Sequence, residues 1–271
     1  MRAIESTLFK QWFKNIQTER GLLSNGSMSL RQVIIQGVDM FGNCVGFLKF
    51  KAEVIDKETR SKFLCASHRS GARLALRLAP QAMEARTALA RLSPLTTMIP
   101  GIVFARGPAV AVLILLESDG ETYAVLTEQV RVPVGKLIVE LPAGMLDDDK
   151  GDIVGTAVRE VEEETGLHLN LDDLVDLTAF LHPSTGCKVF PSPGGCDEEI
   201  SLLLYRGSVD KGIIKQLQER ETGIRDHGEL IRVHIIPYRD LWRMTPDAKV
   251  LTAIALYEMA MRDGLLPLRK D

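Results

Sequence analysis

Residues 141–146 read LPAGML, and residues 159–167 read REVEEETGL. The acidic stretch 147–149 lies between them. At a helical period of about 3.6 residues per turn, Glu160, Glu163 and Glu164 share one face of a helix. Another face carries valines that can pack on a sheet, namely Val154, Val158 and Val161. The sequence therefore predicts an amphipathic helix over residues 153–165 with an anionic stripe.

The crowded carboxylates of this helix require compensation. Like charges three or four positions apart destabilise a helix by about 0.2–0.5 kcal/mol per pair. A divalent cation such as Mg²⁺ or Mn²⁺ would compensate them, because it binds through a few carboxylates and bridges to substrate phosphates. The alternative is a solvated face on which Glu162 and Glu163 pair with Arg159 or a lysine. The glutamates alone leave both interpretations open.

The two stretches together resemble the signature of the Nudix family, G-x5-E-x7-R-E-U-x-E-E-x-G-U, in which U is a bulky aliphatic residue. The matching positions are Gly144, Arg159, Glu160, Val161, Glu163, Glu164, Gly166 and Leu167. Gly144 lies one residue further from Arg159 than the pattern has it, and Gly151 replaces the isolated first glutamate. In the family that glutamate mainly supports the turn before the helix. Asp152 or an acid of residues 147–149 is the expected substitute.

The resemblance implies an α+β Nudix fold, which is an α/β/α sandwich with a mixed sheet. It implies an enzyme that hydrolyses a nucleoside diphosphate linked to another group, with Mg²⁺ or Mn²⁺ as the cofactor. The implied metal ligands are Glu160 and Glu164, with Glu163 close by and the backbone carbonyl of Ala143 completing the shell. Arg159 would orient the glutamates.

The general base is implied to lie in a loop before a late strand, which here is the segment 220–229. Glu229 is the first choice because it borders the strand expected at 230–236. Glu221, Asp226 and His227 are its rivals, and any of these residues can also be an ordinary polar residue of a loop.

Further segments resemble the ADP-ribose and ADP-sugar pyrophosphatases of this family: residues 104–107, 128–131, 141–145 and 193–198. The likeness implies that Arg106 and Arg131 donate hydrogen bonds to phosphate oxygens. Their alternative role is an ion pair at the surface or at a strand end. Glu198 would contact the sugar or a metal-bound water, or else begins the next strand.

The pattern is most similar to the ADP-sugar diphosphatases of plant plastids, which split ADP-glucose or ADP-ribose into AMP and a sugar phosphate. This likeness implies a homodimer in which the N-terminal hairpin of one subunit helps to close the partner's substrate site. It also implies a chloroplast location. Because no Ser-rich transit segment stands before Met1, a cytoplasmic location is the alternative.

Periodicity predicts the remaining elements. Apolar spacing indicates a helix within residues 5–22, and a hairpin is expected over 32–56. The uncharged run 109–116 predicts a central, buried strand. Other strands are expected at 102–105, 123–129, 136–140, 173–180, 199–205 and 231–237, and a last helix at 248–263.

Residues 61–99 depart from this pattern. Arg73, Arg77, Arg86 and Arg91 lie among alanine, leucine and serine, and Glu84 is the only acid nearby. The segment is either an insertion tolerated in a surface loop, which we favour, or an amphipathic element that binds a partner. The expected organisation is an N-terminal helix and dimerisation hairpin at 1–60, an atypical basic insertion at 61–99 and a Nudix domain at 100–271.

Composition narrows the function classes. The 271 residues are 45% hydrophobic and 25% charged, as in ordinary globular proteins, and the net charge is −3. We therefore expect neither nucleic acid nor a membrane as a partner. The four cysteines, Cys44, Cys65, Cys187 and Cys196, lack zinc-site spacing and are typical of thiols in a reducing compartment. Two alternative functions stay open: hydrolysis of another nucleotide such as GDP-mannose or NADH, and a Nudix module that binds a nucleotide sugar without cleaving it.

Overall fold

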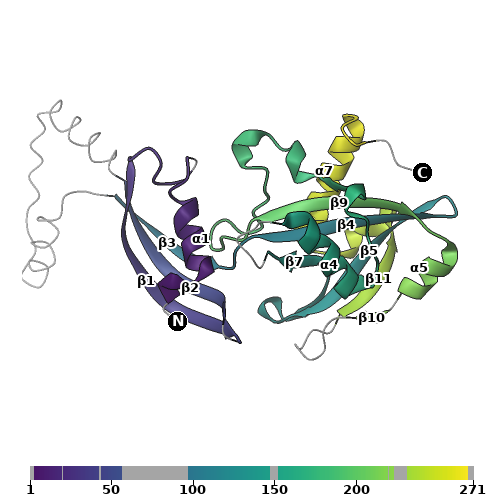
Figure 1. Cartoon of the computed structure of the whole chain (residues 1–271), viewed down its shortest axis with the longest axis horizontal. Helices are drawn as coiled ribbons and strands as arrows, with labels where there is room; N and C mark the ends of the chain where they lie inside the picture. Colours follow the sequence, from purple (N-terminus) through teal and green to yellow (C-terminus); the bar gives the residue numbers. More distant parts are fainter. Residues whose placement is uncertain are drawn as a thin grey trace, which may run out of the picture. The chain divides into compact units, whose positions relative to one another are not determined.

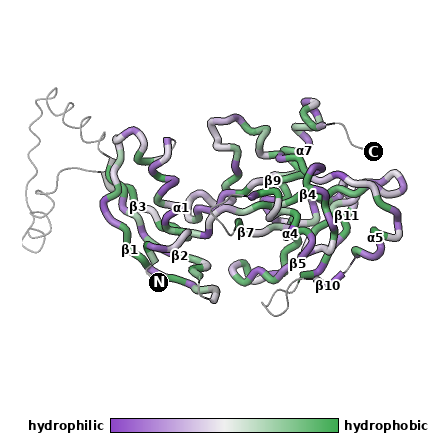
Figure 2. Tube along the Cα trace, viewed as in Figure 1, coloured by the Kyte–Doolittle hydropathy of each residue, from purple (hydrophilic) through white to green (hydrophobic). Residues whose placement is uncertain are grey.

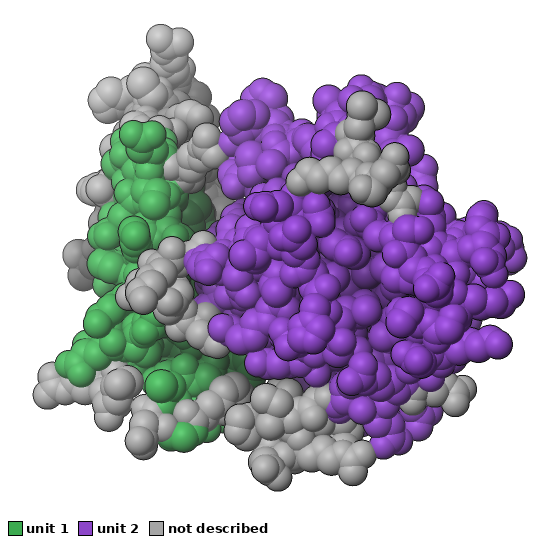
Figure 3. Space-filling view, turned by 45° about the vertical axis from the view of Figure 1, so that its right-hand side comes forward, with its two compact units in different colours: residues 1–106, 194–197 green, residues 107–193, 198–271 purple. Residues whose placement is uncertain are grey.

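The computed structural model describes residues 3–19, 21–42, 44–56, 97–146, 152–218, 220–222 and 231–267. The chain divides into two compact units (Figure 3): residues 1–106 with 194–197, and residues 107–193 with 198–271. The basic segment expected at 61–99 lies outside the described residues except for positions 97–99. The predicted division at residues 60 and 99 therefore stays a prediction.

The first unit is a three-stranded antiparallel sheet with one helix on it (Figure 1). Its strands are β1 (Met28–Phe41), β2 (Cys44–Asp56) and β3 (Thr97–Ala105), in that order. The short 3-10 helix η1 (Ala3–Glu5) and helix α1 (Thr7–Asn15) precede them. Trp12 of α1 packs edge-on against Phe50 of β2, with ring centroids 4.6 Å apart. The hairpin predicted at 32–56 is thus confirmed, and the strand predicted at 102–105 is the end of β3.

The short helix predicted within residues 5–22 is confirmed as α1, which ends at Asn15. The chain turns back at this point, and the amide of Leu23 donates to the carbonyl of Ile16 at 2.9 Å. Gly21 makes the turn feasible, since a Cβ there would lie 2.4 Å from the backbone of Ile16. The turn returns Leu23 to the cluster around Trp12.

The second unit is built on a mixed sheet with the order β10-β11-β5-β4-β9-β8, in which β6 pairs with β5 and β7 pairs with β4. Only the pairing of β4 with β9 is parallel among the described strands. The strands are β4 (Ala109–Ser118), β5 (Glu121–Arg131), β6 (Lys136–Glu140), β7 (Ala143–Met145), β8 (Leu174–Asp176), β9 (Ile200–Ser208), β10 (Glu221–Thr222) and β11 (Ile231–Pro237).

Helices cover both faces of this sheet (Figure 1). The helices are α4 (Ile153–Thr165), α5 (Lys211–Leu217), α6 (Tyr238–Met244) and α7 (Ala248–Arg262). Four short 3-10 turns connect the elements: η2 (Val132–Val134), η3 (Leu171–Asp173), η4 (Thr178–Phe180) and η5 (Pro183–Thr185). Among the described residues, no helix combines the length and apolarity that crossing a bilayer requires.

Strand β4 lies at the centre of the sheet, as its uncharged sequence predicts, and is almost continuously hydrophobic (Figure 2). Because side chains alternate along a strand, it supplies both cores. Val110, Val112 and Ile114 pack with Val161 of α4, whereas Leu113 packs with Val250 of α7 and their neighbours. These two cores confirm the α/β/α sandwich and the α+β class.

The strand predicted at 173–180 is wrong beyond Asp176. One carboxylate oxygen of Asp176 accepts hydrogen bonds from the backbone of Thr178 and Ala179, at 2.8 and 3.1 Å. This local side-chain bonding replaces the strand by the turn η4. Elements that the sequence did not predict are β7, β10, α5 and α6. The two strands are too short to show a period, and the two helices span only seven residues each.

Candidate active site

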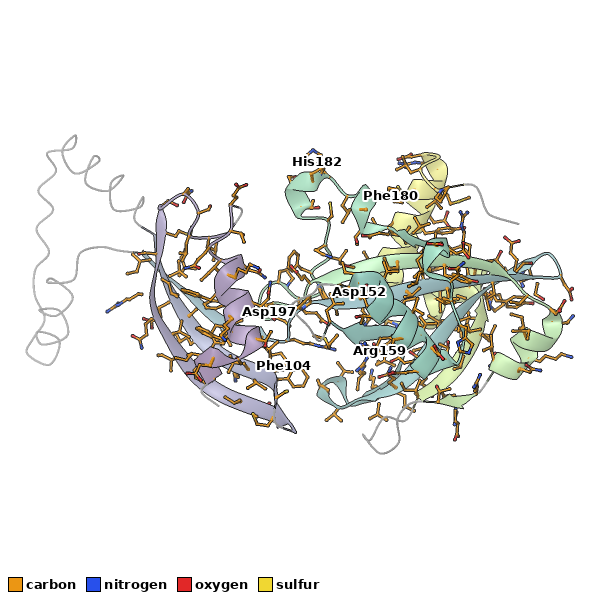
Figure 4. All side chains as sticks on the ribbon, in the orientation of Figure 1. Phe104, Asp152, Arg159, Phe180, His182 and Asp197 are labelled. Atoms are coloured by element: carbon orange, nitrogen blue, oxygen red, sulfur yellow. The ribbon has the colours of Figure 1, made fainter. Side chains whose placement is uncertain are left out.

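Helix α4 carries the glutamates and has a capping residue at each end. Asp152 caps its N-terminus by accepting a hydrogen bond from the amide of Gly155 at 2.9 Å. Gly166 ends it in the left-handed conformation, with φ of 72°. Figure 4 shows Asp152 at the start of α4 and Arg159 further along it. The helix predicted at 153–165 is confirmed, and Asp152 is its N-cap; the turn at 147–151 lies outside the described residues.

Strand β7 brings residues 141–144, called here the LPAG loop, against α4. A Cβ built on Gly144 would lie 2.0 Å from Cδ of Glu160 and 2.2 Å from its Oε1. Only glycine leaves the space that the carboxyl group of Glu160 fills. The register of β7 with β4 pairs Gly144 with Val110 and so fixes where the loop lies along the sheet.

Glu164 is the most deeply buried of the three glutamates on this face and is 7% exposed. Its Oε2 accepts a hydrogen bond from the amide of Ala143 at 3.2 Å. Its Oε1 accepts one from Nε2 of Gln129 on β5 at 2.9 Å. The LPAG loop, the Nudix-like helix and strand β5 therefore meet at one carboxyl group.

The electrostatic setting of Glu164 favours a nearby positive charge. Burial is the largest influence and raises the pKa of Glu164 to about 8, against the opposing hydrogen bond from Ala143. The negative charge of Glu160 raises this pKa further. A buried carboxyl group beside a second carboxylate holds a proton near neutral pH unless a cation takes the proton's place.

The other two members of the motif are placed differently. Arg159 Nη2 lies 3.8 Å from Oε1 of Glu160, which suits a role in orienting that carboxylate. Glu163 is exposed. Within the part of the chain that the structure describes, no group of three or more Asp, Glu, His or Cys side chains is arranged to hold a metal ion.

The donor set nevertheless fits a hard divalent cation. Glu160 and Glu164 supply two carboxylates on one helix face, and both the burial of Glu164 and the charge of Glu160 disfavour an ionised Glu164 without a cation. These two residues would hold Mg²⁺ or Mn²⁺. The contact that the structure shows for Ala143 is made by its amide, so the ligand role of its carbonyl stays a prediction, as does a direct role of Glu163.

Comparison with known proteins agrees with this geometry. The model of the NUDIX domain matches residues 105–253, which is more than half of the chain. The chain belongs to the Nudix family. The match includes α4, so its glutamates are part of the Nudix domain and not merely a solvated acidic face.

Individual relatives support the assignment. The chain is 61% identical to "Nudix hydrolase 14, chloroplastic" of Arabidopsis thaliana over 264 residues, which cover 97% of this chain and 74% of the relative. It is 29% identical to the "ADP-ribose pyrophosphatase" of Bacillus subtilis over 57% of this chain and 74% of the relative. It is also 37% identical to the "Methanol dehydrogenase activator" of Bacillus methanolicus over 42% of this chain and 53% of that protein.

Arg131 lies on the strand that also carries Gln129. Residues two apart on a strand face the same side, so its side chain leaves β5 on the face of Glu164. Its guanidinium binds Glu140 through two bonds, from Nε to Oε1 at 2.6 Å and from Nη2 to Oε2 at 2.9 Å. The hydrogen bond to Glu140 raises the pKa of Arg131. The ion pair that the sequence offered as an alternative is thus present.

Two residues that sequence reasoning missed attach the C-terminal end of the Nudix helix to strand β10. The hydroxyl of Thr222 donates to the backbone carbonyl of Glu164. The guanidinium of Arg220 lies against Gly166, where a Cβ would approach Nη1 to 2.3 Å. A cation at this end of a helix is favourable to the helix dipole. No sequence pattern pairs these positions, because 58 residues separate Thr222 from Glu164.

The remaining predicted residues are placed as follows. Arg106 belongs to the first unit, and its amide donates to Oδ1 of Asp197 at 2.7 Å. Glu198 is half-buried and lies two residues before β9. Glu221 is in β10, opposite Arg232 of β11. The other candidate bases, Asp226, His227 and Glu229, lie outside the described residues.

A pocket of about 260 Å³ opens beside β10. Its lining residues are Glu128, Val130, Leu137, Glu221, Thr222, Ile231 and Arg232. Ligand pockets commonly have volumes of roughly 300–1,000 Å³, so this one can hold only part of a dinucleotide-sized molecule. Thr222 belongs both to this pocket and to the attachment of Glu164.

Proposed function

We propose that this Nudix protein is a Mg²⁺-dependent ADP-sugar diphosphatase. The substrates would be ADP-glucose and ADP-ribose, and the products AMP with glucose 1-phosphate or ribose 5-phosphate. The observation that carries the proposal is the convergence of Glu160, Glu164 and the LPAG loop, with Arg131 on the same face of β5. The relative named ADP-ribose pyrophosphatase supports this substrate class.

The reaction adds water across the diphosphate. The water oxygen forms a bond to one phosphorus, the bridging P–O bond breaks, and a base accepts the water's proton. When bound, the cation polarises the phosphate oxygens and activates the attacking water. Glu160 and Glu164 would hold it, and Arg159 would keep Glu160 oriented.

The chain's own residues would supply the remaining steps. Arg131 would donate to a diphosphate oxygen, because a guanidinium fixed on one edge keeps donors on the other. Arg106 and Glu198 are proposed to contact phosphate and sugar, respectively. Glu229 is proposed to accept the proton, with Glu221, Asp226 and His227 as its rivals.

The same proposal includes a homodimer formed through the first unit. Its support is a set of exposed apolar side chains on β1 and β3: Ile34, Val38, Met40, Ile99, Ile102 and Phe104. Large exposed apolar surface commonly marks an interface between proteins. A chloroplast location is proposed from the name of the Arabidopsis relative. Light scattering of the purified protein tests the dimer, and a tagged chain in plant cells tests the location.

One assay tests the activity. Purified protein with Mg²⁺ is offered ADP-glucose, ADP-ribose, GDP-mannose and NADH, and the products are identified by chromatography. AMP with a sugar phosphate, formed fastest from the two ADP-sugars, is the expected result. Faster cleavage of GDP-mannose or NADH rejects the substrate class. Tight binding without cleavage of any of the four rejects the hydrolase and supports a binding module.

A further inference from the structure

Four charged side chains form a continuous row from the start of α7 to the face of β5 that carries Gln129. Asp247 Oδ1 lies 3.1 Å from Nζ of Lys249. The same Nζ lies 2.9 Å from Oε2 of Glu140. Glu140 in turn holds Arg131 with two hydrogen bonds, at 2.6 and 2.9 Å. Negative and positive charges thus alternate along the row.

Glu140 is the most deeply buried member of the row. The side chain of Glu140 is 4% exposed, whereas that of Arg131 is 35% exposed. A carboxylate this deeply buried is tolerated only when it is paired and hydrogen-bonded. Burial raises the pKa of Glu140, but hydrogen bonds from Arg131 and the charge and hydrogen bond of Lys249 outweigh burial and lower it. Glu140 is therefore ionised and pairs with two positively charged side chains, Arg131 and Lys249.

Within the described part of the chain, the Arg131 guanidinium makes side-chain hydrogen bonds along one edge, to Glu140. Glu140 occupies Nε and Nη2, and a guanidinium has five N–H donors in a planar fork. Both hydrogens of Nη1 and the second hydrogen of Nη2 therefore lie on the other edges. The charge of Glu164 also raises the pKa of Arg131, which reflects the proximity of the two groups.

We propose that Glu140 and Lys249 are positioning residues that fix Arg131 for a diphosphate oxygen. Glu140 sets the orientation of the guanidinium. Lys249 supplies a second positive charge, so that the row Asp247, Lys249, Glu140 and Arg131 is neutral in sum and its two carboxylates do not repel the substrate. This inference rests on the proposed function, because a diphosphate is the anion that Arg131 would bind.

Asp247 makes the charge argument testable. Without Lys249, the charges of Arg131, Glu140 and Asp247 sum to −1 instead of zero, next to an anionic substrate. Removing the charge of Asp247 as well returns the sum to zero. Asparagine is a suitable replacement at 247, because its side-chain oxygen can still accept the capping hydrogen bond from the amide of Lys249.

The experiment measures steady-state hydrolysis of ADP-ribose with Mg²⁺ by the full-length wild type and four variants. Lys249→Met should raise KM about tenfold, a change of about 1.4 kcal/mol, with kcat altered less than about twofold. Asp247→Asn/Lys249→Met should restore most of the lost affinity, and so should Lys249→Arg. Lys215→Met, which removes the same charge from an exposed position of α5, should leave KM unchanged.

Two further readouts separate positioning from a structural role. The effect of Lys249→Met on KM should shrink as salt rises, because a charge effect is screened. Thermal unfolding of each variant shows whether it is folded. If Lys249→Met does not fold, Lys249→Gln replaces it, because it removes the same charge. An unchanged KM, or a fall in kcat that the charge-restoring double variant does not repair, overturns the inference.

Binding of inorganic pyrophosphate distinguishes this failure from failure of the proposed function. Its dissociation constant, measured by calorimetry with Mg²⁺ in the same variants, should follow the same order as KM. If the wild type cleaves no ADP-sugar, the proposed function fails, and the pyrophosphate constants still decide the role of Lys249. Equal constants for wild type and Lys249→Met overturn that role.

Discussion

The carboxyl group of Glu160 fills the space that a side chain at Gly144 would occupy, and a Cβ there would lie 2.0 Å from its Cδ. The glycine of the Nudix signature and the first glutamate after its arginine therefore form one packing unit. Because the obstructing atoms are the end of a flexible side chain, a larger residue at 144 would displace the carboxylate and leave the backbone in place. Such a substitution would therefore weaken metal binding more than it lowers the stability of the fold.

Gly144→Ala should lower kcat/KM and Mg²⁺ affinity by about 10–100-fold, the usual effect of disturbing the setting of a metal ligand. The melting temperature should change little. Gly212→Ala is the matched control, because a Cβ on this glycine of α5 meets nothing within 4 Å. Full activity in Gly144→Ala would show that the position of Glu160 does not matter.

The raised pKa of Glu164 predicts a pH-dependent stability of the metal-free protein. Its pKa is about 8 in the folded state against 4.5 ordinarily, so its stabilising contribution is full below pH 4.5 and is lost as pH rises through 8. Glu164→Gln removes this titration. The unfolding free energy of the wild type should therefore fall relative to that of the variant, by at most about 1.4 kcal/mol per pH unit in this window.

Urea unfolding between pH 5 and 8.5 measures this difference. Saturating Mg²⁺ should flatten it, because a bound cation keeps Glu164 ionised without penalty. Parallel curves for wild type and Glu164→Gln across the whole range would contradict the raised pKa.

Asp152 is expected to act through the helix and not through the metal. Asp152→Ala should cost about 1 kcal/mol of unfolding free energy through loss of the N-cap, whereas Asp152→Asn should cost far less. Turnover of folded protein should be nearly unchanged in both variants. A large loss of Mg²⁺ affinity in Asp152→Asn would instead give this carboxylate a place in the metal site.

Glu229→Gln tests the proposed base. Turnover should fall by two to four orders of magnitude, about the contribution of general base catalysis, and Mg²⁺ affinity should be unchanged. Glu221→Gln serves as the rival variant measured in parallel. Near-normal turnover of Glu229→Gln together with a large loss in Glu221→Gln would reassign the base.

The parts of the fold that follow from local periodicity could be predicted from the sequence. The helix 153–165 and the buried strand 109–116 agree with α4 and β4 because each buries a regular apolar pattern. The glutamates that converge at the loop were likewise indicated by a motif. The end of α1 could not be predicted, because the turn at Gly21 depends on the packing of Leu23.

The setting of the site depends on tertiary contacts that no pattern encodes. The bond of Lys249 to Glu140 joins residues 109 apart, and Gln129 reaches Glu164 across 35 residues. These hydrogen-bond partners depend on which strands and helices lie next to each other in the folded chain. The sequence indicated an ion pair as an alternative role of Arg131, but no pattern could show that its partner is Glu140.

The central claim is that Glu160 and Glu164 are tolerated together because they hold cations against a diphosphate. Mn²⁺ titration followed by electron paramagnetic resonance, with ADP-ribose hydrolysis measured on the same samples, tests it in wild type and Glu160→Gln/Glu164→Gln. We predict that the double variant stays folded but loses both Mn²⁺ binding and hydrolysis. Unchanged Mn²⁺ binding and unchanged hydrolysis in the folded double variant would contradict the account.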